Sequence, residues 1–272
     1  MEQLLIPVAV VAVMGLVLGV VLAVASKRLA VPVDEKFHDI RSLLPGVNCG
    51  VCGCAGCDEY AQKVLDGEIA TNLCMPGGSD VALGLSELMG TEALDIIPSK
   101  AVVKCNGGLE STGRVMDYVG PRTCEASNAL YQGRGKCSYG CMGYGDCAVA
   151  CPENAIQIED GIAVINRKYC IGCGLCVSTC PKKLILLTPE ASRTYVSCSS
   201  LDKGGVTRKI CSKGCIGCKR CEKVCEYGAV EVIDNVAVIH PEKCVNCRKC
   251  REVCPTNSIR DYPVVTWEPK EA

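Results

Sequence analysis

The sequence predicts an α+β protein in which a single N-terminal transmembrane helix and a small helical domain precede two tandem copies of one module. Three observations predict this arrangement. The run Leu4–Ala25 carries no charge, cysteines cluster between positions 49 and 74, and the remaining chain repeats itself at a constant offset. The 25 cysteines among 272 residues accompany only one Phe and one Trp, which leaves little for a large aromatic core. We therefore expect bound metal to replace part of that core.

The uncharged N-terminal run, Leu4–Ala25, is long enough to cross a bilayer core of about 30 Å. A cleaved signal peptide is the alternative, because Ala23-Val24-Ala25 resembles a cleavage site. However, the start Met1-Glu2-Gln3 lacks positive charge and the apolar run is too long. Lys27 and Arg28 follow the run, so the positive-inside rule places the bulk of the chain on the cytoplasmic side. We expect a single-pass protein of the cytoplasmic (inner) cell membrane, on a reducing side that suits free thiolates.

The small helical domain contains five cysteines within a short stretch. Cys49, Cys52, Cys57 and Cys74 suffice to bind one [4Fe–4S] cluster, and Cys54 is left over. Glycines around the first three cysteines allow the backbone to turn tightly about a cluster. Residues 58–65 and 81–89 are expected to be helical.

The motif C-x-x-C-x-x-C-x-x-x-C occurs twice between residues 215 and 254. Three thiolates at every third position bind one cluster, and the fourth reaches a neighbouring cluster. This pattern predicts a ferredoxin-like module with two [4Fe–4S] clusters. The expected ligand sets are Cys215, Cys218, Cys221 and Cys254 for one cluster, and Cys225, Cys244, Cys247 and Cys250 for the other. Zinc is the alternative, since C-x-x-C pairs also build zinc sites, but zinc gives no reason for triplets.

The same module occurs earlier in the chain, at a constant offset by which Cys147 matches Cys221 and Cys180 matches Cys254. Each copy contains two alternating apolar runs, within residues 155–165 in the first copy and 229–239 in the second. In each copy these runs predict a β-hairpin between the cluster motifs. Tyr144 stands where the second copy has Cys218, and Cys137 is the expected replacement ligand. The predicted sets of the first module are Cys137, Cys141, Cys147 and Cys180, and Cys151, Cys170, Cys173 and Cys176.

This assignment gives five [4Fe–4S] clusters and uses twenty cysteines. The unassigned cysteines are Cys54, Cys105, Cys124, Cys198 and Cys211, of which Cys124 and Cys198 are a matched pair at the repeat offset. They are interpreted as buried or peripheral thiols. A sixth cluster would require four of these five to converge.

The motifs and composition also place the expected domain boundaries. These are 1–28 for the transmembrane anchor, 29–90 for the single-cluster domain, 91–135 for a connecting segment, 136–190 for the first ferredoxin-like module, 191–210 for a linker, 211–263 for the second module, and 264–272 for a tail.

The small domain resembles a known family. The run 43–53, the pair Gly56-Cys57 and the closing segment 72–78 are similar to the cluster domain of the B subunit of the Rnf complex, with Cys54 as a departure. The order of helix, small domain and ferredoxin modules matches that subunit, as does the spacing around Cys137. The resemblance implies an electron-transfer subunit of a membrane-bound, ion-translocating ferredoxin:NAD oxidoreductase, coupled to sodium or proton movement. Such a subunit takes electrons from soluble ferredoxin and passes them to other membrane subunits, which hold the flavin and nicotinamide sites.

The chain itself is expected to carry electrons and to have no catalytic residue. His38 and His240 stand outside any nucleophile or metal motif, and no nucleic-acid partner is expected. Residues 203–251 carry eleven Lys/Arg against five Asp/Glu, which could steer an acidic ferredoxin. Seven of these basic residues surround the last module: Lys213, Lys219, Arg220, Lys223, Arg248, Lys249 and Arg251. Balancing the charge of anionic clusters, or a solvated face, explains them equally well. A polyferredoxin subunit of another membrane oxidoreductase, such as a hydrogenase, and a non-redox metal scaffold stay open as alternative functions.

Overall fold

The computed structural model describes residues 2–28, 35–92, 96–130, 132–263 and 265–269. Helix α1, Glu2–Arg28, is continuous and covers the uncharged run. Judged over the described residues alone, no helix is both long enough and apolar enough to cross a membrane. The structure therefore does not support the transmembrane helix predicted over Leu4–Ala25.

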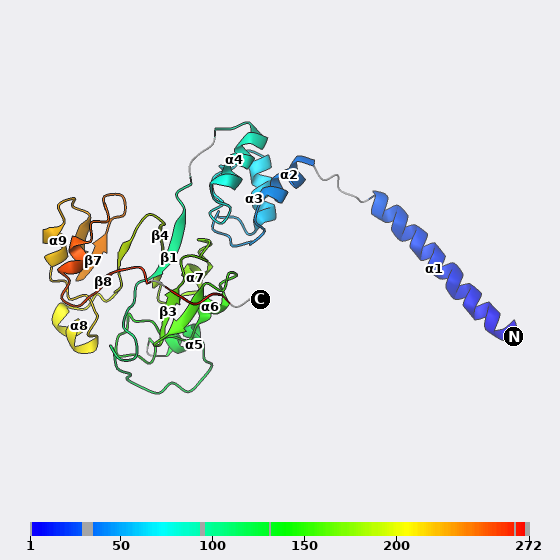
Figure 1. Ribbon diagram of the computed structural model, residues 1–272. Helices are drawn as coiled ribbons and strands as arrows, with labels where there is room; N and C mark the ends of the chain where they lie inside the picture. Colours follow the sequence, from blue (N-terminus) through cyan, green and yellow to red (C-terminus); the bar gives the residue numbers. More distant parts are fainter. Residues whose placement is uncertain (1, 29–34, 93–95, 131, 264, 270–272) are drawn as a thin grey trace.

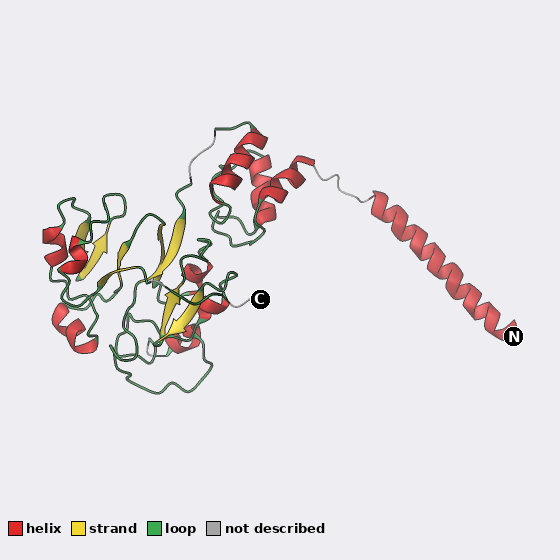
Figure 2. Ribbon diagram, in the orientation of Figure 1, coloured by secondary structure: helices red, strands yellow, loops and turns green. Residues whose placement is uncertain are grey.

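Three helices build the small domain: α2 Glu35–Leu43, α3 Cys57–Leu65 and α4 Gly78–Met89. They pack around a core that includes Ile40, Tyr60 and Leu85, each at most 1% exposed. The helices predicted over 58–65 and 81–89 are confirmed. Figure 2 shows that this part of the chain is helical, whereas the described strands all lie in the parts that follow.

The first module is built around the hairpin of β2 Ile156–Glu159 and β3 Ile162–Ile165. Its remaining elements are α5 Cys124–Ala129, α6 Asp146–Val149, α7 Leu175–Thr179 and β4 Ile185–Pro189. Asp160 and Gly161 connect the hairpin strands with positive φ angles of 48° and 74°, as a two-residue turn between twisted strands requires. The hairpin predicted between the two cluster motifs is confirmed.

The second module repeats this plan. Its hairpin consists of β6 Val230–Ile233 and β7 Val236–Ile239 and turns at Asp234 and Asn235, which also have positive φ. Its other elements are α8 Gly204–Ile210, α9 Arg220–Val224, α10 Lys249–Glu252 and β8 Ile259–Asp261.

Each module receives one further strand from the segment that precedes it. Strand β1, Ser99–Val103, pairs antiparallel with β4, and β5, Thr194–Val196, pairs antiparallel with β8. The segments 91–135 and 191–210, which were expected only to connect domains, therefore supply part of each module. Figure 1 shows β1 leading from the small domain into the first module.

These strand pairings make residues of the two modules structurally equivalent even where the constant sequence offset does not match them. Ile185 of β4 and Ile259 of β8 match at the repeat offset, and their partners across the ladder are Val103 and Val196, which do not. The backbone pairing extends one residue further in both modules, through Lys104 N–H to Leu184 O (2.8 Å) and Ser197 N–H to Ser258 O (2.7 Å). Two residues beyond the paired valines, Cys105 and Cys198 are therefore structurally equivalent.

Polar and aromatic contacts join the two modules. Tyr195 of β5 stacks on Tyr262, with ring centroids 5.0 Å apart, and the Arg167 guanidinium of the first module lies 3.6 Å from the centroid of the Tyr262 ring. Arg260 of β8 donates a hydrogen bond to Asn106, next to Cys105. The chain then returns to the first module, where Trp267 Nε1 donates to Glu159 Oε1 at 2.7 Å. The two modules are thus held together along several lines of contact.

Candidate iron–sulfur sites

All 25 cysteines lie in the described part of the chain, and none of them is in a disulfide. Among the described residues, no three His, Cys, Asp or Glu side chains are close enough to share a single metal ion. In a four-iron cluster each thiolate binds a different iron, so the sulfur atoms stand farther apart than around one ion. The test for such a site is whether four cysteines line one cavity or lie within electrostatic reach of one another.

The small domain meets this test with the predicted set. Cys49, Cys52, Cys57 and Cys74 line one cavity with about 330 Å³ of space free of protein atoms. Asn48 accepts a hydrogen bond from the backbone N–H of Cys57 at 2.8 Å, which orients the start of α3 toward the loop that holds the first two cysteines. The four thiols therefore fit one [4Fe–4S] cluster.

The fifth cysteine of this domain, Cys54, is outside the wall of that cavity. Its side chain is only 5% exposed and packs in the helical core. Burial, followed by the charge and hydrogen bond of Cys52, raises the pKa of its thiol. Cys54 is thus a core residue beside the site.

A second cavity lies in the first module, and Cys124 lines it together with Cys141, Cys147 and Cys180. About 410 Å³ of this site is free of protein atoms, and part of that space is open to solvent. Burial, followed by the nearby charges of Cys141, Cys124 and Cys180, raises the pKa of Cys147 to about 12. The sequence predicted Cys137 as the partner of Cys141, Cys147 and Cys180, but the structure places Cys124 there.

Asp146 explains how Cys124 reaches this position. Cys124 is the first residue of α5, and its backbone N–H donates to both carboxylate oxygens of Asp146, at 2.8 and 2.9 Å. Asp146 begins α6, which carries Cys147 as its next residue. One carboxylate therefore fixes two helix starts so that their cysteines face the same cavity.

The first module has a second site, called the inner site below, where the predicted set of Cys151, Cys170, Cys173 and Cys176 lies together. Burial, followed by the charges of Cys170, Cys173 and Cys151, raises the pKa of Cys176 to about 12. The backbone N–H of Ala101 in β1 lies 3.4 Å from Cys170 Sγ, so the added strand contributes a hydrogen bond to this site.

The second module also brings its predicted sets together. Burial, followed by the nearby charges of Cys215 and Cys218, raises the pKa of Cys221 to about 11. Cys254 is in turn among the charges that raise the pKa of Cys215, after burial and the charge of Cys198.

The last predicted set, Cys225, Cys244, Cys247 and Cys250, gathers in the same way. Burial, followed by the charges of Cys244, Cys247 and Cys225, raises the pKa of Cys250 to about 11. The other three members therefore lie within electrostatic reach of Cys250.

Backbone hydrogen bonds to sulfur recur at the fourth cysteine of the motifs. The N–H groups of Ala155, Leu184 and Ala229 lie 3.3–3.4 Å from the sulfur of the cysteine four residues earlier, which is Cys151, Cys180 and Cys225 respectively. Such bonds stabilise the thiolate form of a ligand and tune the potential of a bound cluster. They favour a cluster-binding role for these cysteines.

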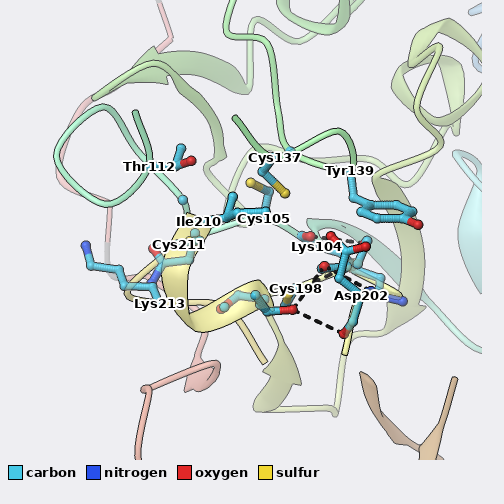
Figure 3. Close-up of a pocket in the computed structure, with 18 residues that line it drawn as sticks. Lys104, Cys105, Thr112, Cys137, Tyr139, Cys198, Asp202, Ile210, Cys211 and Lys213 are labelled. Carbon is cyan, nitrogen blue, oxygen red and sulfur yellow. Dashed lines mark hydrogen bonds between the residues drawn. The ribbon is translucent and has the colours of Figure 1, made fainter. Parts of the chain in front are cut away.

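Four remaining cysteines converge on a third cavity, between the two modules. Cys105, Cys137, Cys198 and Cys211 line it (Figure 3), and it has about 440 Å³ of space free of protein atoms. Spacing along the chain did not predict this convergence, because Cys137 was expected to join Cys141, Cys147 and Cys180. The sequence does contain one sign of this convergence, because Cys137 and Cys211 occupy equivalent positions at the repeat offset.

The candidate sites of the second module are the most exposed to solvent. Cys218 and Cys247 are exposed, whereas every cysteine that lines the sites of the first module and the small domain is buried or half-buried. The basic residues predicted around this module divide into two groups. The paired ones are Lys219 with Glu222 (3.7 Å), Lys249 with Glu226 (2.5 Å), and Arg248 and Arg251 with Asp261 (3.5 and 2.8 Å). Within the described part of the chain, no ion pair forms at Lys213, or at Arg220 and Lys223 of α9.

Fold and sites together define a multicluster iron–sulfur protein of the ferredoxin type. Comparison with family models agrees with this class. A model described as "Putative Fe-S cluster" matches residues 44–76, and models described as "4Fe-4S dicluster domain" match residues 136–184, 214–258 and 169–229.

Curated relatives identify the family. The chain is 38% identical over 260 residues to the B subunit of the Na(+)-translocating ferredoxin:NAD(+) oxidoreductase complex of Acetobacterium woodii, covering 95% of this chain and 78% of the relative. It is 39% identical over 241 residues to the proton-translocating counterpart of Clostridium ljungdahlii (88% and 85%). It is 37% identical over 237 residues to the B subunit of the ion-translocating oxidoreductase complex of Methanosarcina acetivorans (87% and 90%). The chain therefore belongs to the family of B subunits of the ion-translocating Rnf oxidoreductase complexes.

Proposed function

We propose that this chain is the electron-transfer subunit of a membrane-bound ferredoxin:NAD oxidoreductase that is coupled to sodium or proton translocation. In this proposal the second module accepts electrons from soluble ferredoxin, and the first module and the small domain pass them to membrane subunits of the complex. The names of the three relatives support the reaction. The observation that carries the direction is the exposure of Cys218 and Cys247 in the second module.

The ligand sets are part of the proposal. Clusters of the [4Fe–4S] type bound at these sites would accept and release single electrons. We assign Cys49, Cys52, Cys57 and Cys74; Cys151, Cys170, Cys173 and Cys176; Cys215, Cys218, Cys221 and Cys254; and Cys225, Cys244, Cys247 and Cys250, all as the sequence predicts. The fifth set is Cys124, Cys141, Cys147 and Cys180, which replaces the predicted set containing Cys137 because Cys124 lines the cavity with the other three. Iron, acid-labile sulfide and zinc determinations on the full chain test these assignments, and a preparation that contains mostly zinc would refute them.

The docking of ferredoxin is supported by charge next to the exposed cysteines. Arg220 and Lys223 flank Cys221 on α9, and their charges are not neutralised by an ion pair among the described residues. An acidic partner would be drawn to these free charges, because complementary charges raise the rate of encounter.

A close contact between the first module and the small domain supports the proposal that electrons leave the first module there. Val51, in the cysteine loop of the small domain, packs against Gly174, so that a Cβ on Gly174 would lie 3.1 Å from Val51 Cγ2. Cys49 and Cys173 lie near enough that the charge of Cys49 raises the pKa of Cys173, after burial and the charge of Cys151. The Cys49–Cys74 site is therefore the neighbour of the inner site of the first module.

Charge reversal on α9 tests the docking surface. We expect the double variant Arg220→Glu/Lys223→Glu to be reduced by an acidic ferredoxin roughly tenfold more slowly at low salt, and to lose most of the salt dependence of that rate. The matched control is Arg114→Glu/Arg122→Glu, which reverses two exposed charges near the first module. Stopped-flow reduction of the full chain across a salt series measures both. An unchanged salt dependence in the α9 variant would refute this docking surface.

We also propose that α1 attaches the chain to the inner membrane as a single pass, with the bulk of the chain on the cytoplasmic side. The described side chains of this helix are exposed on all sides, and its large apolar residues from Val13 to Val24 are each at least 50% exposed. Apolar surface of this extent is favourable only when lipid or partner helices cover it. Alkaline extraction of membranes tests the attachment. Leu16→Arg should release the chain from the membrane, and Ser26→Arg should not. If Leu16→Arg also stays in the membrane, the proposal is contradicted.

A further inference from the structure

We propose that Cys105, Cys137, Cys198 and Cys211 bind a sixth [4Fe–4S] cluster in the cavity between the two modules. The first and second modules would each contribute two of its ligands. This site goes beyond the five clusters proposed above and rests on the proposed function only for its role in electron transfer.

The cavity has the dimensions and the lining of a cluster site. Its free space of about 440 Å³ is similar to the 410 Å³ and 330 Å³ at the two other four-cysteine cavities. Figure 3 shows the sulfur-bearing side chains on opposite sides of it. Gly107 leaves room between two of them, because a Cβ there would lie 3.1 Å from Cys211 Sγ and 3.9 Å from Cys105 Sγ. Cys198 and Cys211 are also the thiols whose charges act on Cys137.

The four cysteines form two structurally equivalent pairs. Cys105 and Cys198 each follow the strand that pairs with the last strand of their module, β1 on β4 and β5 on β8. Cys137 and Cys211 match at the repeat offset, as Cys147 and Cys221 do. Each module therefore presents the same two positions to the same cavity. Ser199 Oγ donates to Lys104 O at 3.1 Å and holds the two strand ends together at this point.

The sulfur atoms have the same backbone environment as the assigned ligands. Cys105 Sγ lies 3.4 Å from the N–H of Cys141, and Cys198 Sγ lies 3.5 Å from the N–H of Ser200. The N–H···S distances at the assigned ligands of both modules are 3.3–3.4 Å. In contrast, the sulfur of Cys54 interacts with the side chain of Cys52.

A residue that lines the proposed site also carries a buried hydroxyl without a hydrogen-bond partner. Thr112 Oγ1 is buried and has no hydrogen-bond partner among the described residues, and Thr112 lines the same cavity. Leaving a buried hydroxyl without a hydrogen-bond partner is unfavourable. A cluster sulfur atom would supply the missing acceptor.

The count of cysteines agrees with six sites. The five clusters proposed above use 20 cysteines, with Cys124 in place of Cys137, and the four cysteines of this cavity bring the number to 24 of the 25 in the chain. The one left over is Cys54, which lines none of the three four-cysteine cavities. Interpreting the four as inert buried thiols would leave their convergence from four separate segments without a cause.

A cluster in this position would lie between the second module, where ferredoxin is proposed to dock, and the first. It would also act as a crosslink, because its ligands come from both modules. Metal bound in this way contributes its binding free energy to folding, so the interface between the modules would depend on it.

The test is the metal content of the full chain, purified without oxygen in detergent. We expect about 24 irons and about 24 sulfides per chain in the wild type, from six clusters of four irons, and negligible zinc. Cys105→Ser, Cys198→Ser and Cys211→Ser should each contain about 20 irons and lose the same component of the EPR spectrum. The matched control, Cys54→Ser, should retain the wild-type content and spectrum.

A second pair of variants separates this site from that of the first module. Cys137→Ser should lose the same EPR component as Cys211→Ser, whereas Cys124→Ser should lose a different one. The proposal is overturned if Cys137→Ser and Cys124→Ser lose the same component while Cys198→Ser and Cys211→Ser retain all iron.

The wild-type count decides the question even if a substitution prevents folding. About 20 irons per chain, with or without one zinc, overturns the sixth cluster and leaves the proposed function intact. A preparation dominated by zinc would refute both. Native mass spectrometry of the intact chain resolves these cases, because each bound cluster adds a fixed mass.

Discussion

Asp146 holds Cys124 by accepting the backbone N–H of that residue with both carboxylate oxygens, at 2.8 and 2.9 Å. Because Cys124 begins α5 and Asp146 begins α6, the carboxylate joins the starts of two short helices. This bond places Cys124, rather than Cys137, beside Cys147 in the first module.

Removing this carboxylate should loosen one corner of the site. We expect Asp146→Ala to leave the N–H groups at the start of α5 without an acceptor, at a cost of about 1–3 kcal/mol. The visible absorbance of the bound clusters should then decay faster in air than in the wild type. The control is Glu125→Ala, an exposed acid on the same helix. Equal decay rates for the two variants would contradict this role for Asp146.

Tyr60 fixes the loop that carries Cys74. Its side chain is 1% exposed, and its hydroxyl donates to Ala70 O (3.0 Å) and accepts from Leu73 N–H (3.2 Å). We expect Tyr60→Phe to lower the free energy of unfolding of the small domain by about 1–3 kcal/mol. Chemical denaturation of the full chain, followed by the loss of helix signal, measures the change. Tyr227→Phe, at an exposed tyrosine, should be neutral.

The same tyrosine predicts a pH dependence. Burial raises the pKa of Tyr60 to about 12 from an ordinary value of 10. Its folded pKa lies above its unfolded pKa, so the stability it contributes is fully present below pH 10 and is lost as the pH rises toward 12. The difference in unfolding free energy between wild type and Tyr60→Phe should therefore be constant at neutral pH and shrink between these two values. A difference that grows with pH would contradict the assignment.

Lys182 lies beside the first-module cavity and within reach of the cavity between the modules. It lines the former, its Nζ donates to Ser138 O at 2.6 Å, and burial lowers its pKa while the charges of Cys137 and Cys105 raise it. A positive charge stabilises the reduced, more negative form of a nearby cluster. We expect Lys182→Met to lower the midpoint potential of at least one cluster by tens of millivolts, as measured by EPR redox titration. Lys183→Met removes a charge at the neighbouring position, which lines none of the cysteine cavities, and should leave the potentials unchanged.

Gly174 sets how closely the small domain approaches the first module. It has φ of +71°, and a Cβ would lie 3.1 Å from Val51 Cγ2. Gly174→Ala should destabilise the chain by about 1–2 kcal/mol through backbone strain and slow the oxidation of the first module by the Cys49–Cys74 site. Adding Val51→Ala removes the clash and should restore the transfer rate but not the stability. Thermal unfolding and rapid-mixing kinetics separate these two effects. A wild-type transfer rate in Gly174→Ala alone would argue against electron transfer at this contact.

Local patterns were enough to predict the elements within each module. Alternating apolar residues on both sides of Asp160-Gly161 and Asp234-Asn235 predicted the two hairpins, because side chains of a half-buried strand alternate between faces and these turn residues tolerate positive φ. The triplets of cysteines predicted three ligands of each cluster in the second module, because ligands three residues apart bind within one loop. The membrane-spanning helix predicted from the uncharged N-terminal run stays outside what the described structure supports.

The sequence alone determined that this protein consists of repeated two-cluster modules with a separate small cluster domain. It did so because those features depend on residues close together in the chain. Only the tertiary structure decided where Cys105, Cys124, Cys137, Cys198 and Cys211 belong. Strand β1 meets β4 from a distant part of the chain, and that pairing makes Cys105, not Cys124, the counterpart of Cys198. Spacing along the chain cannot encode such a relation, because it arises from the way two preceding segments add a strand to each module.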